Sequence, residues 1–563
     1  MDGPDQMYTF TKFVGEARSG SPTPPLRRIP LSEEQGRPNS KSQTSQPAIA
    51  VGIPGIIHPT TMAPSKAARS ISQEAFEEMV KENMEDLGMD PSEALEDAVQ
   101  TLTLQGVDLS GIVKCIPGVT GTNDNPAIQT LEGLKGMAGY LLSSQNNDKP
   151  SEMKASDQKI NKLDGAIDLE QMIELLDKLY ILCSIEGSSD RSVVTRNGGV
   201  ELVTTICSAL HGRHEQPLVS ALKTLSIILH DLQSADKFQQ SGGPKIVVDI
   251  LDQYRENKDI LHWVFSVVAA AATGNEILKE NFMDLKIDEL LVETMKDETR
   301  RNSQSLYDAL QVLLTADDNR VVASQKLIIE VAFGTISKPL EAQVFGYARR
   351  FAKIGAAFAL VDALNGGVCS PCLASASFAL KALAVNDEIC QNIADCGGID
   401  AVLKCIDDSG VQNNKTIAKA CCSLLSKLAG SDTNKTGIIQ KGGLDRLISL
   451  SSRFSEDPSV LQEIMSIFCV VSLRSPENAN RAMEAGAGDF AIQAMKKFPA
   501  AAQMQRQSCL MIRNLVVRSP EIRAILLANG VEKIIRVAKQ SHASCKDAAA
   551  AALRDLGLDD YNS

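Results

Sequence analysis

Apolar residues recur at helical spacing along most of this 563-residue chain. The first clear run follows Ser72, where Phe76, Val80 and Met84 come one turn apart and Gly88 ends the run. Side chains at this spacing share one face of a helix. Serine is a favourable N-cap, and glycine often ends a helix. We therefore predict a helix between Ser72 and Gly88.

A second helix is predicted directly afterwards. Asp90 and Pro91 supply an N-cap and a favourable first helical residue. Apolar residues then return every four positions, at Ala94, Ala98 and Leu102. The two segments predict a helical hairpin.

The N-terminal part divides into three predicted segments. Residues 1–69 hold ten of the 22 prolines and are predicted to be a disordered extension. The hairpin occupies residues 70–120, and residues 121–159 are predicted to be a linker with one short helix. From about 160 to 558, one apolar helical segment follows another, which predicts an all-α protein.

Glycines recur at a nearly fixed interval in this last region. Gly198 and Gly242 are 44 residues apart, and the later intervals from Gly397 are 45, 44 and 44 residues. Each glycine falls between a short helical segment and a longer one, where it permits a sharp turn. The structural turns are Gly198, Gly242, Gly397, Gly442, Gly486 and Gly530.

A period in the low forties is typical of solenoids of the armadillo or HEAT type. In these folds each repeat packs on its neighbours, and the stack offers partners a long groove. We predict an array of about nine repeats over residues 160–558. Lys286 takes the turn position after Gly242, and Gly355 follows 69 residues later, which predicts an insertion near residues 319–343.

The groove helices can be aligned from the last repeat. Asn514 precedes Gly530 by 16 residues, and the same offset from the earlier turns defines a ladder of equivalent positions. The ladder consists of Leu182, Ser226, Ala270, Lys381, Ser426, Val470 and Asn514.

Basic side chains collect near this ladder. Two interpretations are open: a solvated charged surface, or a groove that receives an acidic segment of another protein or of this chain's own acidic hairpin. For Asn514 the alternatives are a bond to partner backbone and a bond to the neighbouring repeat. The candidate partner-binding residues are Arg349, Arg350, Lys353, Lys381, Lys427, Arg513 and Asn514.

The net charge of −13 is unevenly distributed. Residues 70–187 carry 8 Lys/Arg against 22 Asp/Glu, whereas residues 1–69 have a small positive excess. No domain is strongly basic and aromatic residues make up 4% of the chain, which argues against nucleic-acid binding. The predicted partner is a protein.

The sequence offers little material for catalysis. Cys369 and Cys372, followed by Cys390 and Cys396, approach the spacing of metal ligands, but the later two fall on separate helical segments. Small apolar filling is the preferred interpretation. The glycine pairs lack the Lys-Ser/Thr of a phosphate loop, and no Ser/His/Asp or Cys/His set emerges. We predict no enzyme activity, no cofactor and no metal.

Scattered cysteines within apolar segments predict a reduced, intracellular protein of the cytoplasm or the nucleus. No apolar run reaches the roughly 18 residues of a membrane span. The amino terminus lacks a signal-peptide pattern, and Asp2, Asp5 and Glu16 argue against a transit peptide.

The chain resembles the armadillo repeat-containing protein 6 family over residues 70–558. The resemblance implies an armadillo fold without known enzymatic activity, and residues 1–69 and 326–343 depart from it as an extension and an insert. The stretches that carry it are Ser70–Lys114, Thr315–Arg320, Leu380–Cys390, Met511–Val516 and Ala552–Gly557.

Import receptors of the importin-alpha kind hold peptides with an asparagine at the ladder position and a tryptophan one turn earlier. Here only Asn514 provides the asparagine, and the single tryptophan, Trp263, is out of that register. The favoured prediction is a non-catalytic scaffold that binds a protein along its concave groove. A cargo or assembly adaptor is the alternative, and an enzyme or an enzyme's regulatory subunit is a remote one.

Overall fold

The computed structural model describes residues 69–109, 112–117, 125–145, 169–185, 189–315, 341–366 and 370–559. Within these residues the chain is all-α except for two strands of two residues each, and the predicted helical solenoid is confirmed. Residues 1–68 of the predicted disordered extension lie outside the described residues. Residues 319–340 of the predicted insertion lie outside them as well.

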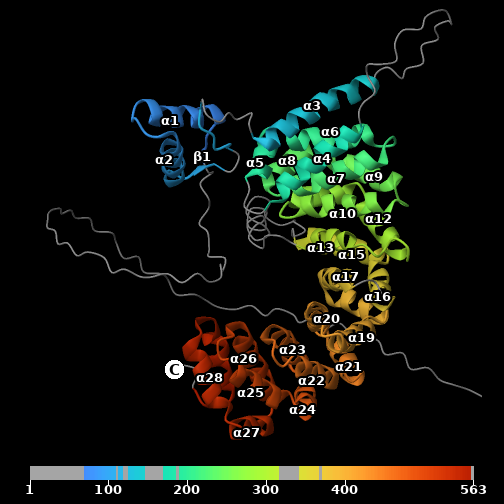
Figure 1. The fold of residues 1–563 in the computed structure, drawn as a ribbon. Coiled ribbons are helices and arrows are strands. Elements are labelled where there is room, and N and C mark those ends of the chain that lie inside the picture. The colour runs from blue at the N-terminus through green and yellow to red at the C-terminus, as the bar shows by residue number, and fades with distance from the viewer. Residues whose placement is uncertain are drawn as a thin grey trace, which may run out of the picture. The chain divides into compact units, whose positions relative to one another are not determined.

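The N-terminal hairpin consists of α1 (Gln73–Glu85) and α2 (Pro91–Leu104) (Figure 1). The Ser72 hydroxyl accepts a hydrogen bond from the Ala75 amide, and the Asp90 carboxylate accepts one from the Ser92 amide, so both predicted caps are present. The two helices bury a small core of Phe76, Val80, Ala94, Ala98, Leu102 and Ile112.

Two short strands flank the hairpin. β1 (Arg69–Ser70) and β2 (Val107–Asp108) pair in parallel. The sequence did not predict them, because a strand of two residues contains no periodic pattern. Asp108 lies 3.7 Å from the guanidinium of Arg196, which connects this region to the array.

The helix predicted as a short linker element is longer and belongs to the array. α3 (Pro126–Gln145) has 20 residues, and its buried Leu131 and Leu134 join the main core. It packs against α4 (Leu169–Ser184) and α6 (Gly199–Leu210). Glycines weaken its helical signal in the sequence, whereas packing of its apolar face stabilises the helix. The helical array therefore starts at Pro126 rather than near residue 160.

From residue 190 onward the described residues form eight three-helix repeats, preceded by the pair α3 and α4, in agreement with the predicted nine or so. Each repeat starts with a short first helix that packs on the second. The first helices are α5 (Asp190–Arg196), α8 (Leu232–Gln240), α11 (Glu276–Asp284), α15 (Glu341–Lys353), α18 (Asp387–Asp395), α21 (Asp432–Gln440), α24 (Pro476–Glu484) and α27 (Pro520–Ala528).

The second helices begin at the glycine turns. Gly442 has a φ of +70°, which favours glycine, and a Cβ on the following Gly443 would lie 2.7 Å from the carbonyl oxygen of Ile438. In the repeat that lacks the glycine, Lys286 takes the same left-handed conformation, with a φ of 61°. The second helices are α6, α9 (Gly243–Gln253), α12 (Ile287–Lys296), α16 (Ala356–Asn365), α19 (Gly398–Val411), α22 (Gly443–Arg453), α25 (Ala487–Lys497) and α28 (Val531–Ser541).

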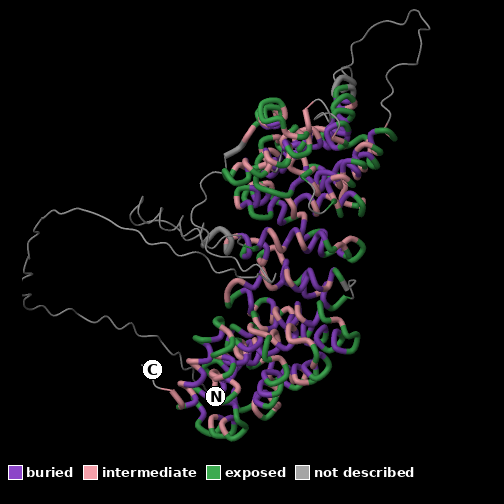
Figure 2. Tube along the Cα trace, turned by 60° about the vertical axis from the view of Figure 1, so that its left-hand side comes forward, coloured by how far each residue is buried: buried purple, intermediate pink, exposed green. Residues whose placement is uncertain are grey.

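The third helices pack against one another in sequence order, each on the next. Buried positions recur on every one of them, which makes a continuous core along the array (Figure 2). The third helices are α4, α7 (Glu215–Ile228), α10 (Lys258–Ala272), α13 (Gln304–Leu314), α17 (Ser370–Leu383), α20 (Lys415–Leu428), α23 (Pro458–Val471), α26 (Ala502–Val516) and α29 (Lys546–Asp555).

The array continues across the long interval between α13 and α15. The third helices α13 and α17 pack directly on each other. Arg350 of α15 donates two hydrogen bonds, of 3.1 and 2.8 Å, to the buried carboxylate of Asp288 on α12. Arg301, itself buried, lies 2.5 Å from the Asp362 carboxylate on α16. These two ion pairs therefore connect the repeat before the long interval with the repeat after it.

Candidate interaction face

The third helices together present one partly exposed surface, which we call the third-helix face. Residues four, seven and eight positions apart on a helix lie on the same side. On α20, Lys419, Ser423 and Ser426 are partly exposed in this pattern, and Lys427 is exposed. All seven ladder positions predicted from the sequence lie on third helices and are partly exposed. The alignment from glycine spacing therefore predicted positions on the partly exposed side of the third helices.

The part of this face formed by α17, α20, α23 and α26 is positively charged. Their sequences contain six basic residues and one acidic residue, Glu463, so positive charge dominates. The predicted candidates Lys381, Lys427 and Arg513 lie here. Lys419 and Arg506 occupy the same face and were missed by the sequence analysis, because it considered only the ladder position and its immediate neighbours. We call Lys381, Lys419, Lys427, Arg506 and Arg513 the cationic face.

The remaining lysine of α20 belongs to a structural ion pair. The Nζ of Lys415 lies 3.1 Å from the Asp457 carboxylate, which also accepts hydrogen bonds from the Ser459 and Val460 amides at the start of α23. Burial acts to raise the pKa of Asp457, but hydrogen bonds from Ser459 and Lys415 outweigh it and lower the pKa to about 2. Lys415 therefore stabilises a helix start and is left out of the cationic face.

The members of the cationic face are held by light contacts with neighbouring repeats. Lys381 donates a 2.6 Å hydrogen bond to the Ser423 hydroxyl, and the Nε of Arg513 lies 3.0 Å from the Asp555 carboxylate. Lys427 and Arg506 are exposed. The side chain of Arg513 remains 42% exposed, but its partner Asp555 is only 8% exposed, so Arg513 contributes less free positive charge than Lys427 and Arg506.

Asn514 bonds to the neighbouring repeat. Its Nδ2 donates to the Cys469 carbonyl of α23 at 2.8 Å and lies 3.2 Å from the Cys469 sulfur. Of the two alternatives for this residue, the inter-repeat bond is the one present in the folded chain. The partner contact stays a prediction.

Replacing Asn514 separates these two roles. Asn514→Ala removes the hydrogen bond to Cys469, so we expect the free energy of unfolding to fall by about 1 kcal/mol, with a lower melting temperature. Gln507→Ala, on the same face of α26, is the matched control and should melt like wild type. Thermal unfolding followed by circular dichroism measures both. Unchanged melting together with weaker partner binding would instead assign Asn514 to the partner.

The basic run at Arg349, Arg350 and Lys353 does not lie on the third-helix face. It belongs to α15, a first helix, and Arg350 is committed to Asp288 and to the Met283 carbonyl. Arg349 and Lys353 are exposed on that helix. The prediction that this run lines the groove is therefore corrected, because the run belongs to a first helix. Arg350 pairs internally with Asp288, and the adjacent Arg349 points to a different side of the same helix.

The part of the third-helix face formed by α4, α7 and α10 has a different chemistry. Trp263 lies on α10 seven residues before Ala270, two turns from the ladder position rather than one, and is partly exposed. Its ring packs edge-on against Tyr180 of α4, with 6.2 Å between ring centroids, and against His262, with 4.8 Å. Trp263 is out of the import-receptor register, but it lies on the partly exposed third-helix face.

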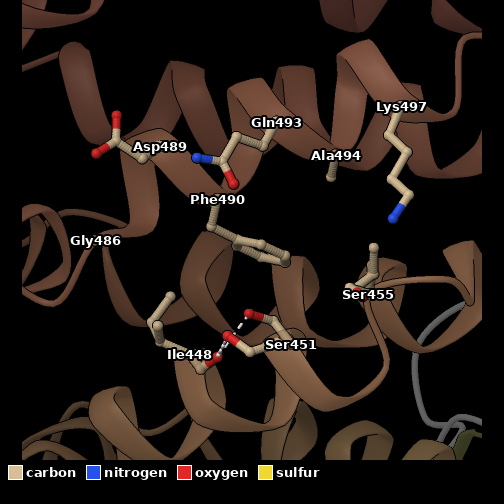
Figure 3. Close-up of a pocket in the computed structure, with 11 residues that line it drawn as sticks. Ile448, Ser451, Ser455, Gly486, Asp489, Phe490, Gln493, Ala494 and Lys497 are labelled. Atoms are coloured by element: carbon tan, nitrogen blue, oxygen red, sulfur yellow. Dashed lines mark hydrogen bonds between the residues drawn. The ribbon is translucent and has the colours of Figure 1, made fainter.

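A pocket of about 480 Å³ also opens between the second helices α22 and α25. Figure 3 shows Phe490 reaching into the space opposite Ile448 and Ser451, with Lys497 at one end. The Ser451 hydroxyl donates to the Ile448 carbonyl, and Lys497 forms an ion pair with Glu456. These polar groups are engaged within the fold, and the lining residues contain no histidine or cysteine for acid–base or nucleophilic work.

Ten of the twelve described cysteines are buried, and Cys396 and Cys469 are partly buried. Burial raises the pKa of Cys207 and Cys509 to about 12 and the pKa of Cys469 to about 11. A protonated thiol is a poor nucleophile and a poor metal ligand at neutral pH. Cys372 and Cys390 are buried, Cys396 is partly buried, and Cys369 lies outside the described residues.

No group of three or more His, Cys, Asp or Glu side chains in the described residues is placed to hold a metal ion. None of the described helices combines the length and the apolar character required to cross a membrane.

Comparison with known proteins agrees with the resemblance stated from the sequence. Residues 68–149 match the family model of the armadillo repeat-containing protein 6 N-terminal domain. The chain is 26% identical to armadillo repeat-containing protein 6 of Homo sapiens over 439 residues, which are 75% of this chain and 77% of the human protein. It is 24% identical to the Drosophila melanogaster homolog over 426 residues, covering 74% of this chain and 80% of that protein.

Solved structures of engineered and designed proteins are also similar. An engineered protein aligns with 75% of this chain and 98% of its own, at 16% identity and a TM-score of 0.46. A designed armadillo repeat protein aligns with 48% of this chain and 99% of its own, at 18% identity and a TM-score of 0.37.

Proposed function

We propose that this chain, which carries the armadillo repeat-containing protein 6 N-terminal domain followed by an armadillo repeat array, binds a protein partner along its third-helix face. The fold and the similar proteins indicate a protein-interaction scaffold, and no catalytic family is indicated. The finer assignment concerns where the partner binds and what chemistry it brings. A non-catalytic, intracellular role accords with the mostly buried thiols.

The cationic face is the observation that supports this assignment best. Lys419, Lys427 and Arg506 lie on an open surface with Glu463 as the single acidic residue of the four helices. Like charges on neighbouring repeats repel one another, and an acidic ligand relieves this repulsion. We infer that the partner contributes an extended acidic segment, which crosses α17, α20, α23 and α26.

The acidic hairpin of α1 and α2 is a second source of such a segment. Glu74, Glu78, Glu82 and Glu93 are exposed on these two helices. Docking of this hairpin onto the cationic face is therefore an intramolecular form of the same proposal, and it would compete with a partner. A cargo or assembly adaptor would use the same face and differs only in what the partner does next.

Charge reversal on the face tests the proposal. In the full chain, Lys419→Glu with Lys427→Glu should weaken binding of an acidic partner peptide by about tenfold or more, because two attractive contacts become repulsive. The loss should be larger at low salt, since screening weakens exposed charge contacts. Fluorescence anisotropy with a labelled peptide, extended and rich in Asp and Glu, measures the affinity.

A matched pair of variants provides the control. Lys245→Glu with Lys533→Glu makes the same change in net charge on the second helices α9 and α28, where both lysines are exposed. This pair should bind the acidic peptide nearly as well as wild type. An equal loss with both pairs would mean that only net charge matters, and the assignment to the third-helix face would be wrong.

A further inference from the structure

The third-helix face changes from cationic to aromatic toward its N-terminal repeats. Trp263, the single tryptophan of the chain, is partly exposed on α10 and lies edge-on to Tyr180 of α4. Ile181 on the same α4 helix is 62% exposed. Aromatic residues make up only 4% of the sequence, so a tryptophan and a tyrosine side by side on an open surface are unusual for this chain.

The lysine in contact with Tyr180 is already paired with a carboxylate. The Nζ of Lys223, on α7 between α4 and α10, lies 3.1 Å from the Asp177 carboxylate and 4.4 Å from the centroid of the Tyr180 ring. The Lys223 ammonium therefore already forms an ion pair and a cation–π contact within the fold. Lys223 is consequently less available to an anionic ligand than the exposed Lys427 of the cationic face.

A pocket adjoins the aromatic pair. Its volume is about 720 Å³, and it lies where α10, α13 and α17 begin. His262 connects the two features, because it lines the pocket, and its ring also packs against Trp263. Leu261, Pro371 and Cys372 contribute apolar lining, and the rest of the lining is polar or charged: Lys258, His262, Glu298, Thr299, Arg300, Asn302, Ser303 and Gln304. The pocket and the aromatic pair are large enough together to receive one aromatic side chain.

We propose that Tyr180, Trp263, His262 and the adjoining pocket form an aromatic subsite, which binds an aromatic side chain of the same partner segment whose acidic residues bind the cationic face. This inference rests on the proposed function. Stacked or edge-to-face aromatic contacts favour this type of side chain, and tryptophan and tyrosine are enriched among residues that dominate binding energy. The partner motif is thus bipartite, with one aromatic anchor and one acidic run.

The spacing within the motif follows from helix packing. Two steps separate α10 from α17, and three separate it from α20, because the third helices follow in order. At about 8–10 Å between packed helices, the subsite lies roughly 16–30 Å from Lys381 and Lys419. An extended chain covers about 3.3–3.6 Å per residue, so the anchor and the acidic run should be about five to nine residues apart.

Selection from a random peptide library tests the inference. The full chain is presented to peptides of about 16 residues, long enough for both parts of the motif. Enriched peptides should combine an aromatic residue with an acidic run at the expected spacing. On Trp263→Ser the aromatic preference should disappear while the acidic preference persists, and an isolated bipartite peptide should bind about tenfold more weakly than to wild type.

Two further measurements guard against a folding defect. Circular dichroism melting shows whether Trp263→Ser and His262→Ala are folded. His262→Ala also removes the contact between the His262 Nδ1 and the Ser305 hydroxyl, and it should weaken the aromatic preference. A bipartite peptide should also shift the fluorescence of Trp263, which needs no label because the chain has no other tryptophan.

The outcomes separate the two proposals. Acidic peptides enriched without an aromatic preference would overturn the aromatic subsite and leave the cationic face in place. If Lys419→Glu with Lys427→Glu selects the same peptides as wild type, the proposed function fails, and the subsite as part of a bipartite motif fails with it. Loss of the aromatic preference on Trp263→Ser and His262→Ala, but not on Lys245→Glu, supports the subsite.

Discussion

Arg350→Ala is expected to lower the free energy of unfolding by about 3 kcal/mol or more, because it strands a buried carboxylate. Asp288 is only 2% exposed, and Arg350 donates to both of its oxygens, at 3.1 and 2.8 Å. The same guanidinium also donates to the Met283 carbonyl at 3.0 Å. Its loss would leave a charge and a carbonyl without these partners at the interface of α12 and α15. Urea denaturation measures the change.

An exposed ion pair provides the comparison. Arg446 lies 2.8 Å from Asp407 between the second helices α22 and α19, and both side chains are 40% or more exposed. Arg446→Ala should cost less than about 1 kcal/mol, because water replaces the lost contact. The double variant Asp288→Asn with Arg350→Ala should recover part of the loss. Equal costs for Arg350→Ala and Arg446→Ala would contradict the special role of the buried pair.

Gly443→Val is the second large effect, with an expected loss of about 2–3 kcal/mol in unfolding free energy. A Cβ at this position would lie 2.7 Å from both the Ile438 carbonyl oxygen and the Ile438 Cγ2, and the carbonyl is backbone that cannot turn away. The β-branched side chain would therefore push α21 and α22 apart. Differential scanning calorimetry should show a lower melting temperature.

Two nearby substitutions separate close approach from backbone conformation. Gly442→Ala meets nothing within 4 Å but must adopt a φ of +70°, which costs about 1–2 kcal/mol. Gly437→Ala, within α21, makes only an ordinary 3.4 Å contact with Ile399 and should be neutral or stabilising, because alanine favours helices. If Gly443→Val melts no lower than Gly437→Ala, the turn is not tightly packed.

The parts of the fold that local sequence determines were predictable. A few neighbouring residues define the caps Ser72 and Asp90 and the glycine turns. These features can therefore be predicted from the sequence without a structure. The ladder from Leu182 to Asn514 followed from the period alone. Helix α3 was underestimated because its stability depends on packing against α4, a contact that local propensity does not contain.

The candidate site was predictable only in outline. Lys381 and Lys427 were found because they stand at or beside the ladder, whereas Lys419 lies seven residues before Ser426 and needed the helix geometry. The partner of Arg350 is 62 residues away in sequence, and no local pattern connects it with Asp288. Trp263 was not chosen as a candidate because it does not match the import-receptor register. It nevertheless lies two helical turns before Ala270, on the same side of the helix.

Direct packing of α13 on α17 has a consequence for how the molecule bears load. The chain's covalent path between these helices is long, but their noncovalent contact is immediate and is reinforced by the Arg350–Asp288 and Arg301–Asp362 pairs. We therefore expect a pulling force along the stacked repeats to be carried by these side-chain contacts and not by the connecting peptide. Substitutions in the α13–α17 interface should consequently destabilise the array more than changes in the connection between these helices.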